Sequence, residues 1–162
     1  MGEIRMVNID YIMELLDWNN SNEEQLYGIK LAQEVKCINA FLQPGIPYGK
    51  SVWDNCAKIL CEKSDIVLAP YLGDLLEWLQ DLNWPGALII LDRLKIFSGE
   101  KLKRPFIDLV TYATNLNNEE GLMWLDNLSE LLDNEELKEE LPKPIVEKLQ
   151  KHYKNWGFWY DE

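Results

Sequence analysis

The sequence contains few of the residues that build metal centres and nucleophilic active sites. Among its 162 residues there is one histidine, His152, and there are three cysteines, Cys37, Cys56 and Cys61, none of them in a C-x-x-C arrangement. A structural zinc site needs four cysteine or histidine ligands, so we expect no metal site. No serine stands in a G-x-S-x-G elbow, and no glycine-rich phosphate loop is present. We therefore expect no catalytic residues and no cofactor, and the unpaired cysteines fit a reducing compartment in which they pack as small hydrophobic residues.

Positive charge and long apolar runs are also scarce. The chain has 16 Lys and Arg residues against 28 Asp and Glu residues, which gives a net charge of −12. Such a charge argues against binding to nucleic acid or to anionic membranes, and favours a basic protein as partner. The alternative interpretation is that the acidity only keeps the protein soluble. The longest apolar run, residues 87–91, is too short for a membrane span, and residues 1–10 do not resemble a signal peptide, so we predict a cytoplasmic protein.

Apolar residues recur with the period of an α-helix along nearly the whole chain. The pattern predicts an all-α protein with a single domain, residues 1–162. Asn8 or Asp10 is the expected cap of the first helix, and Asn22 that of the second. The further expected helices are 51–63, 70–83, 85 to the Ser98-Gly99 pair, 105–114, 118–132 and 142–155, with an irregular connection at 43–49.

A short internal repeat separates two similar helical segments by 60 residues. Tyr11–Trp18 reads YIMELLDW and Tyr71–Trp78 reads YLGDLLEW, and each copy precedes a turn and a second helix with a glycine near its start, Gly28 or Gly86. One such unit cannot bury its apolar face alone, so the repeat predicts stacked helix pairs. The predicted architecture is a HEAT-like α-solenoid of about eight helices.

Residues 75–87, LLEWLQDLNWPGA, resemble a motif of the form L-x-E-W-L-x-D-x-N-W-P-x-A. That motif is similar to one in an uncharacterised family of bacterial helical proteins, described as domains of unknown function with a HEAT-like fold. Similar small helical proteins occur as immunity proteins of bacterial toxin systems, and this is what the resemblance implies for function. Physically, we interpret Trp78 and Trp84 as packing and turn residues, with ligand binding by the two rings as the alternative.

The strongest local charge signal is the acidic segment, residues 119–140, in which Lys138 is the only basic residue. Exposed carboxylates around an aromatic side chain suit a cationic protein partner, with Trp124 as a possible anchor. The alternative is a solvated helical face with Trp124 in the core. We predict a non-enzymatic protein-binding module, such as an immunity or antitoxin-like protein that covers a basic toxin domain. The predicted partner-binding residues are Glu119, Glu120, Trp124, Asp126, Glu130, Asp133, Glu135 and Glu136.

Three other groups of residues leave alternatives open. Glu14 and Asp17 recur as Asp74 and Glu77, so a metal-dependent hydrolase that uses these carboxylates is the rival prediction, while repeated packing positions are the simpler one. A basic patch (Arg93, Lys95, Lys101, Lys103 and Arg104) could pair with the acidic segment, bind a small anion or form an ordinary surface loop. The aromatic tail, residues 155–160, either docks on its own domain or marks an interface.

Overall fold

The computed structural model describes the backbone of residues 8–158 and the side chains of residues 8–151. Within this part of the chain every regular element is a helix and no strand occurs, which confirms the all-α prediction. The chain divides into two compact units, an N-terminal unit (Met1–Lys63) and a C-terminal unit (Ser64–Glu162). The single domain and the continuous HEAT-like solenoid stay predictions. No helix among the described residues combines the length and the apolar character that crossing a membrane requires.

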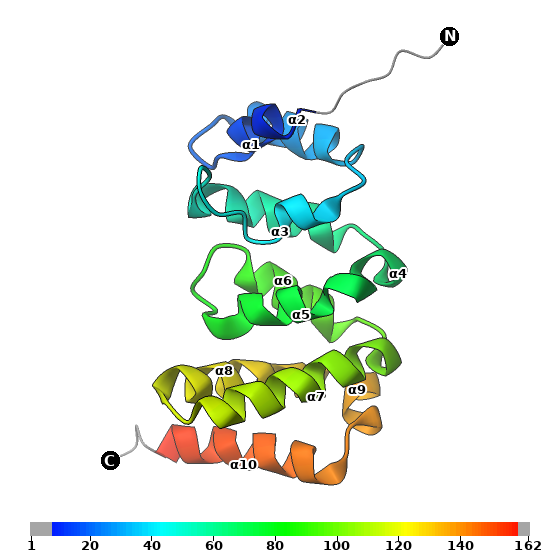
Figure 1. Ribbon diagram of the computed structural model, residues 1–162, viewed down its shortest axis with the longest axis vertical. Helices are drawn as coiled ribbons and strands as arrows, with labels where there is room; N and C mark the ends of the chain where they lie inside the picture. Colours follow the sequence, from blue (N-terminus) through cyan, green and yellow to red (C-terminus); the bar gives the residue numbers. More distant parts are fainter. Residues whose placement is uncertain (1–7, 159–162) are drawn as a thin grey trace. The chain divides into compact units, whose positions relative to one another are not determined.

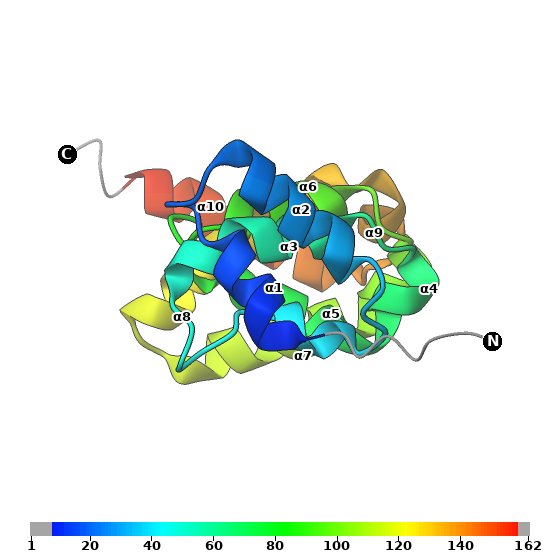
Figure 2. The same cartoon turned by 90° about the horizontal axis from the view of Figure 1, so that it is seen from above.

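The N-terminal unit contains three α-helices with an irregular connection between the second and the third. α1 and α2 lie side by side, followed by α3 (Figure 1, Figure 2). The elements are α1 Ile9–Leu16, α2 Asn22–Ala32, the 3₁₀-helices η1 Ile38–Phe41 and η2 Lys50–Val52, and α3 Trp53–Cys61. Within the connection, the Tyr48 hydroxyl donates to the Asp10 carboxylate and so fastens the loop to α1.

In this unit the predicted cap of α1 is confirmed, whereas the starts of α2 and α3 differ from the prediction. Asn8 caps α1 as predicted, because its side chain accepts the N–H of Tyr11. The cap of α2 is Ser21 and not Asn22, since the Ser21 hydroxyl accepts the N–H of Glu24 and also donates to the Glu24 carboxylate. The helix expected over residues 51–63 begins at Trp53 as α3. Ser51 lies within η2 and does not cap it, because the Ser51 hydroxyl donates to Asp17.

The C-terminal unit contains the remaining helices, with α7 and α8 packed side by side and α10 lying along α8 (Figure 1). Two short helices, α4 and α9, were not expected from the sequence pattern. The elements are α4 Asp65–Leu68, η3 Ala69–Tyr71, α5 Leu72–Glu77, η4 Trp78–Gln80, α6 Ala87–Lys95, α7 Gly99–Leu116, α8 Glu119–Ser129, η5 Glu130–Asp133, α9 Glu135–Glu140 and α10 Lys143–Phe158.

The start of α7 differs from the prediction. Ser98 does not end the preceding helix but caps α7, because its side chain accepts the N–H of Lys101. Pro105, which was expected to open this helix, therefore lies inside it. The helix continues through the proline because the buried side chains of Leu102, Phe106 and Val110 anchor it on both sides.

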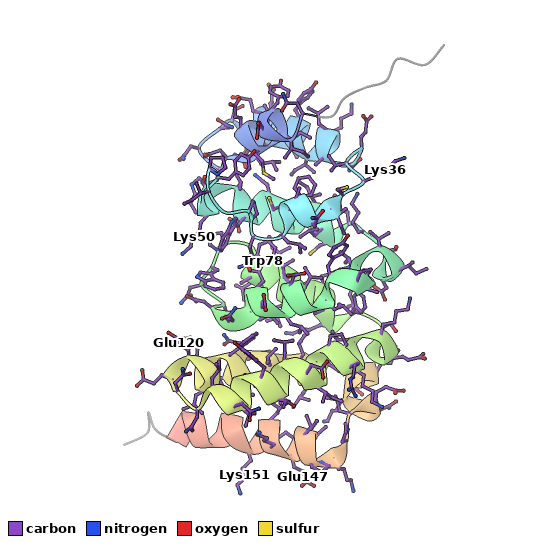
Figure 3. All side chains as sticks on the ribbon, in the orientation of Figure 1. Lys36, Lys50, Trp78, Glu120, Glu147 and Lys151 are labelled. Carbon is purple, nitrogen blue, oxygen red and sulfur yellow. The ribbon has the colours of Figure 1, made fainter. Side chains whose placement is uncertain are left out.

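In the turn after α5, Trp78 packs in the core as predicted, whereas Trp84 is half-buried. Trp78 is fully buried inside its unit (Figure 3), and its indole N–H donates to the Pro85 carbonyl at 2.9 Å. The Asp81 carboxylate accepts the N–H of Asn83 at 2.8 Å. Gly86 precedes α6 with φ 84°, a left-handed conformation that glycine adopts without strain. The motif is thus a turn that redirects the chain into α6.

Buried asparagines hold the ends of the helices. Asn55, Asn127 and Asn134 are the buried polar residues of the described chain, and each side-chain amide donates to carbonyls near a helix end. Asn55 donates to Leu16 at 2.7 Å, and Asn127 donates to Leu79 at 2.8 Å. The last carbonyls of a helix lack partners within it, so these amides supply bonds that water cannot supply in the core.

In both copies of the internal repeat, a side chain donates a hydrogen bond to a carbonyl at the helix end. Leu16 and Leu76 occupy equivalent positions, and both carbonyls accept an N–H from a side chain of a later helix in the same unit. The donor is Asn55 in the first copy and the indole of Trp124, at 3.1 Å, in the second. The recurrence of YIMELLDW and YLGDLLEW is therefore accounted for by packing and by capping.

Asn134 is the best residue for testing whether these side-chain hydrogen bonds stabilise the fold. Its amide donates to Leu94 and to Phe97, each at 2.9 Å, and its oxygen caps α9 at the N–H of Leu137. Asn134→Ala removes all three bonds and is expected to lower the free energy of unfolding by about 2–4 kcal/mol. Urea denaturation measures the change. Asn115→Ala on the exposed side of α7 is the control, and an equal effect of both substitutions would contradict the assignment.

Two helical glycines are expected to respond to alanine with opposite signs. A Cβ atom on Gly99 would lie 2.4 Å from the Leu137 nitrogen, whereas a Cβ atom on Gly73 would meet nothing within 4 Å. Gly99→Ala should lower the free energy of unfolding by about 1–3 kcal/mol or more through overpacking. Gly73→Ala should raise it by about 0.5–1 kcal/mol, because alanine favours the helix. Thermal denaturation of the two variants beside the wild type checks both signs.

Candidate partner-binding site

The acidic segment forms α8, η5 and α9, and most of its carboxylates lie at the surface. Glu119 and Glu120 are exposed in the first turn of α8, where negative charge is favoured by the helix dipole. The side chain of Glu120 points outward from the unit (Figure 3). Glu135 and Glu136 occupy the equivalent first turn of α9 and are also exposed. The segment therefore presents negative charge along two helix starts.

Trp124 does not belong to this surface. Its side chain is 2% exposed, its N–H bonds to the Leu76 carbonyl, and Tyr112 meets its ring edge-on at 5.9 Å. The ring lies on the inner face of α8, with Leu125 and Leu128 buried on the same helix. Trp124 is thus a core residue, as the alternative interpretation has it, and it is not available as a surface anchor. Asp126 is half-buried.

Two of the predicted partner-binding carboxylates also hold this unit together. Glu136 accepts the N–H of Gly99 at 3.0 Å and so bonds the start of α7 to α9. Asp133 lies 3.4 Å from the Lys95 ammonium, with 70% of its own side chain exposed. Pairing between the basic patch and the acidic segment therefore occurs at Lys95.

The two arginines of the basic patch have different partners. Arg93 bonds Asp65 at 2.6 Å, and its guanidinium lies over the Phe97 ring. Arg104 lies 3.6 Å from Asp108, one turn further along α7, in a pair that is almost fully exposed. These contacts are internal to the unit and leave the charge of the acidic segment nearly unchanged.

A groove of about 530 Å³ opens between η5, α9 and α10. Its volume falls in the range of ligand-binding clefts, roughly 300–1,000 Å³. Two of the predicted residues, Glu130 and Asp133, line it together with residues from outside the prediction. The described lining consists of Ser129, Glu130, Leu132, Asp133, Lys138, Leu149 and Gln150. The acidic segment therefore contributes to a groove whose lining also includes apolar residues.

The repeated carboxylates of the rival prediction lie in different units, Glu14 and Asp17 in the first and Asp74 and Glu77 in the second. Asp17 accepts the N–H of Asn19 and the hydroxyl of Ser51, and these bonds outweigh partial burial and lower its pKa. Partial burial, followed by the negative charge of Asp74, raises the pKa of Glu77. Within residues 8–151 no three His, Cys, Asp or Glu side chains come together in a group suited to a metal ion.

The cysteines agree only partly with their prediction. Cys56 is fully buried, and burial raises the pKa of its thiol to about 12, so it packs as a hydrophobic residue. Cys61 is half-buried, whereas Cys37 is exposed and does not pack in the core. The side chain of His152 and those of the aromatic tail, residues 155–160, lie outside the described residues.

A comparison with known families identifies the family of this chain. The family model described as Domain of unknown function (DUF5071) matches residues 46–156, which is more than half of the chain. The chain belongs to this family. The DUF5071 region contains both the groove and the motif at residues 75–87, in agreement with the predicted resemblance to an uncharacterised family. The motif as a family hallmark, the HEAT-like fold and the likeness to immunity proteins stay predictions. No curated protein and no solved structure matches the chain.

Sequence analysis missed five described groove residues of the DUF5071 region, namely Ser129, Leu132, Lys138, Leu149 and Gln150. Leu149 and Gln150 belong to α10, and Lys138 is the single basic residue of the acidic segment. Leu149 is fully buried and shares its helix with exposed charged residues such as Glu147 and Lys151, which point away from the unit (Figure 3). Helical periodicity predicts that Leu149 is buried, but it does not show which helix faces it.

The ion pair of Asp65 makes stability depend on pH. Burial would raise the pKa of Asp65, but the bonds from Arg93 and from the Ser98 N–H, with the charges of Arg93 and Lys101, hold it below its ordinary value. The unfolded chain therefore binds the proton first as the pH falls. The contribution of Asp65 is complete above about pH 4 and is lost as the pH drops through the folded-state pKa.

Asp65→Asn is expected to lower the free energy of unfolding by about 1.5–3 kcal/mol at pH 7, since it removes the ion pair with Arg93 and weakens the hydrogen bonds to a charged group. The difference between variant and wild type should shrink steadily below about pH 4. Urea titrations at several pH values measure it. Asp92→Asn on the exposed side of α6 is the control, and a difference for Asp65→Asn that did not depend on pH would count against the assignment.

Proposed function

We propose that this protein is a non-enzymatic binding module for a basic protein, of the kind formed by immunity or antitoxin proteins that cover a basic toxin domain. The observation that carries the proposal is the groove lined by Glu130 and Asp133 within a surface of exposed carboxylates. Glu119, Glu120, Glu135, Glu139 and Glu140 are exposed, and none has an ion-pair partner among residues 8–151.

Unpaired surface charge of one sign mainly affects the rate at which two proteins associate. A potential of several kT over such a surface steers a cationic partner toward it and raises the association rate at low salt. Tight binding needs in addition a place where side chains leave water, and binding energy concentrates at such central pockets. The groove supplies that place, and the exposed carboxylates of α8 and α9, here called the rim, supply the surface charge.

Charge reversal of the rim tests the proposal. The rim variant carries Glu119→Lys, Glu120→Lys, Glu139→Lys and Glu140→Lys, all outside the groove lining. The matched control variant reverses four exposed carboxylates elsewhere, through Glu14→Lys, Glu23→Lys, Asp74→Lys and Asp92→Lys. Each tagged protein is used to capture partners from a lysate of its native host, and mass spectrometry identifies them.

We expect the wild type and the control variant to retain the same basic protein and the rim variant to lose it, with retention falling as salt rises. Thermal denaturation confirms that both variants are folded. Retention of that protein by the rim variant, or the absence of any basic protein from the wild-type sample, would contradict the proposal. If the captured protein is a toxin, co-expression with the wild-type chain relieves the growth arrest it causes.

A further inference from the structure

The two groove carboxylates stand on one face of a 3₁₀-helix. Glu130 is the first residue of η5 and Asp133 is the last, so they are three positions apart. A 3₁₀-helix has three residues per turn, which places side chains i and i+3 directly above one another, about 6 Å apart along the axis. Both residues line the groove.

Beside these carboxylates the lining includes two leucines, Leu132, which is half-buried, and Leu149, which is fully buried. A ligand with an apolar stem and a cationic end, as lysine and arginine side chains have, suits such a mixed lining. Lys138 lines the groove and Lys95 pairs with Asp133, so the charges of the two lysines balance those of the two carboxylates. Glu130, however, has no ion-pair partner among residues 8–151. A cationic side chain can pair with Glu130.

We propose that this groove binds an arginine side chain of the partner protein. The proposal deepens the proposed function and rests on it. A guanidinium has five N–H donors in a planar fork, so it can bond Glu130 with one edge and Asp133 with another. An ammonium is a compact and strongly hydrated charge, and at this spacing it bonds one carboxylate well and the other poorly.

The remaining polar residues of the groove suit the main chain around that arginine. Lys138 donates hydrogen bonds only, and Gln150 both donates and accepts, so together they can bond peptide carbonyl and N–H groups. Lys95 already lies 3.4 Å from one Asp133 oxygen, Oδ2, at the exposed end of the groove. The lysine fixes that carboxylate without closing the groove, because most of the Asp133 side chain remains exposed.

The experiment uses three capped tripeptides, Ac-Ala-X-Ala-amide, in which X is arginine, lysine or citrulline. Citrulline has the shape of arginine without its charge. Each peptide is titrated into the full ¹⁵N-labelled chain at about 0.15 M salt, a concentration that screens non-specific attraction between surface charges. We expect the arginine peptide to shift the amide signals of residues 129–133, 138 and 149–150. The lysine peptide should bind at least about threefold more weakly, and the citrulline peptide at least about tenfold more weakly.

Matched variants locate the binding. Glu130→Gln and Asp133→Asn should each weaken binding of the arginine peptide by about fivefold to tenfold. Asp92→Asn removes one exposed carboxylate of the same unit, outside the groove lining and outside the rim, and should leave the affinity unchanged. The dispersion of the NMR spectrum shows for each variant that the chain is folded.

Several results would overturn the proposal. Equal affinity for the arginine and citrulline peptides would exclude charge recognition. Equal effects of Glu130→Gln and Asp92→Asn would reduce the binding to general surface attraction. Shifts spread over all acidic helices would do the same. If the rim experiment retains a basic partner and the arginine peptide does not bind the groove, the proposed function stands and this inference fails. If the peptide binds and no basic partner is captured, the proposed function fails instead.

Discussion

Every helix end leaves carbonyl groups that have no partner within the helix, and this chain is built from many short helices whose ends lie in the core. The structure depends on how those carbonyls are satisfied. Asn55, Asn127, Asn134 and the indole of Trp124 donate to them from neighbouring helices in the same unit. A bare carbonyl in an apolar core costs about 1–3 kcal/mol, so these few donors decide whether the short helices can be buried at all.

The same requirement explains how the acidic segment can serve two purposes. Its inner face carries Trp124, Asn127 and Asn134, which bond backbone carbonyls of earlier elements, while its outer face carries carboxylates. Because the inner face fixes α8, η5 and α9 in the core, the outer charges are held in place without needing partners of their own. The ion pair of Asp133 with Lys95 and the hydrogen bond of Glu136 with the Gly99 N–H involve only two of these carboxylates.

The sequence pattern predicted most helices and the core side of each, because a 3.6-residue period is a direct consequence of burying one face. The pattern failed to predict some helix starts, because there the hydrogen bonds of single side chains decide where the helix begins. Ser21 and not Asn22 caps α2, and Ser98 starts a helix where an end was expected, since each hydroxyl bonds a nearby backbone N–H. The carboxylates of the candidate site were predicted from composition, but the groove was not. It requires Leu149 from a helix that follows the acidic segment, and such contacts between helices are not encoded in the period.

The bond between Glu136 and the Gly99 N–H has a consequence for recognition. Together with Asn134, it fastens both the start and the underside of α9 to the core before any partner is present. One wall of the groove is therefore preorganised, and binding does not have to supply the free energy for ordering it. For the proposed partner this wall needs no ordering on binding, so we expect the selectivity of the groove to depend on its chemistry and not on a change of conformation.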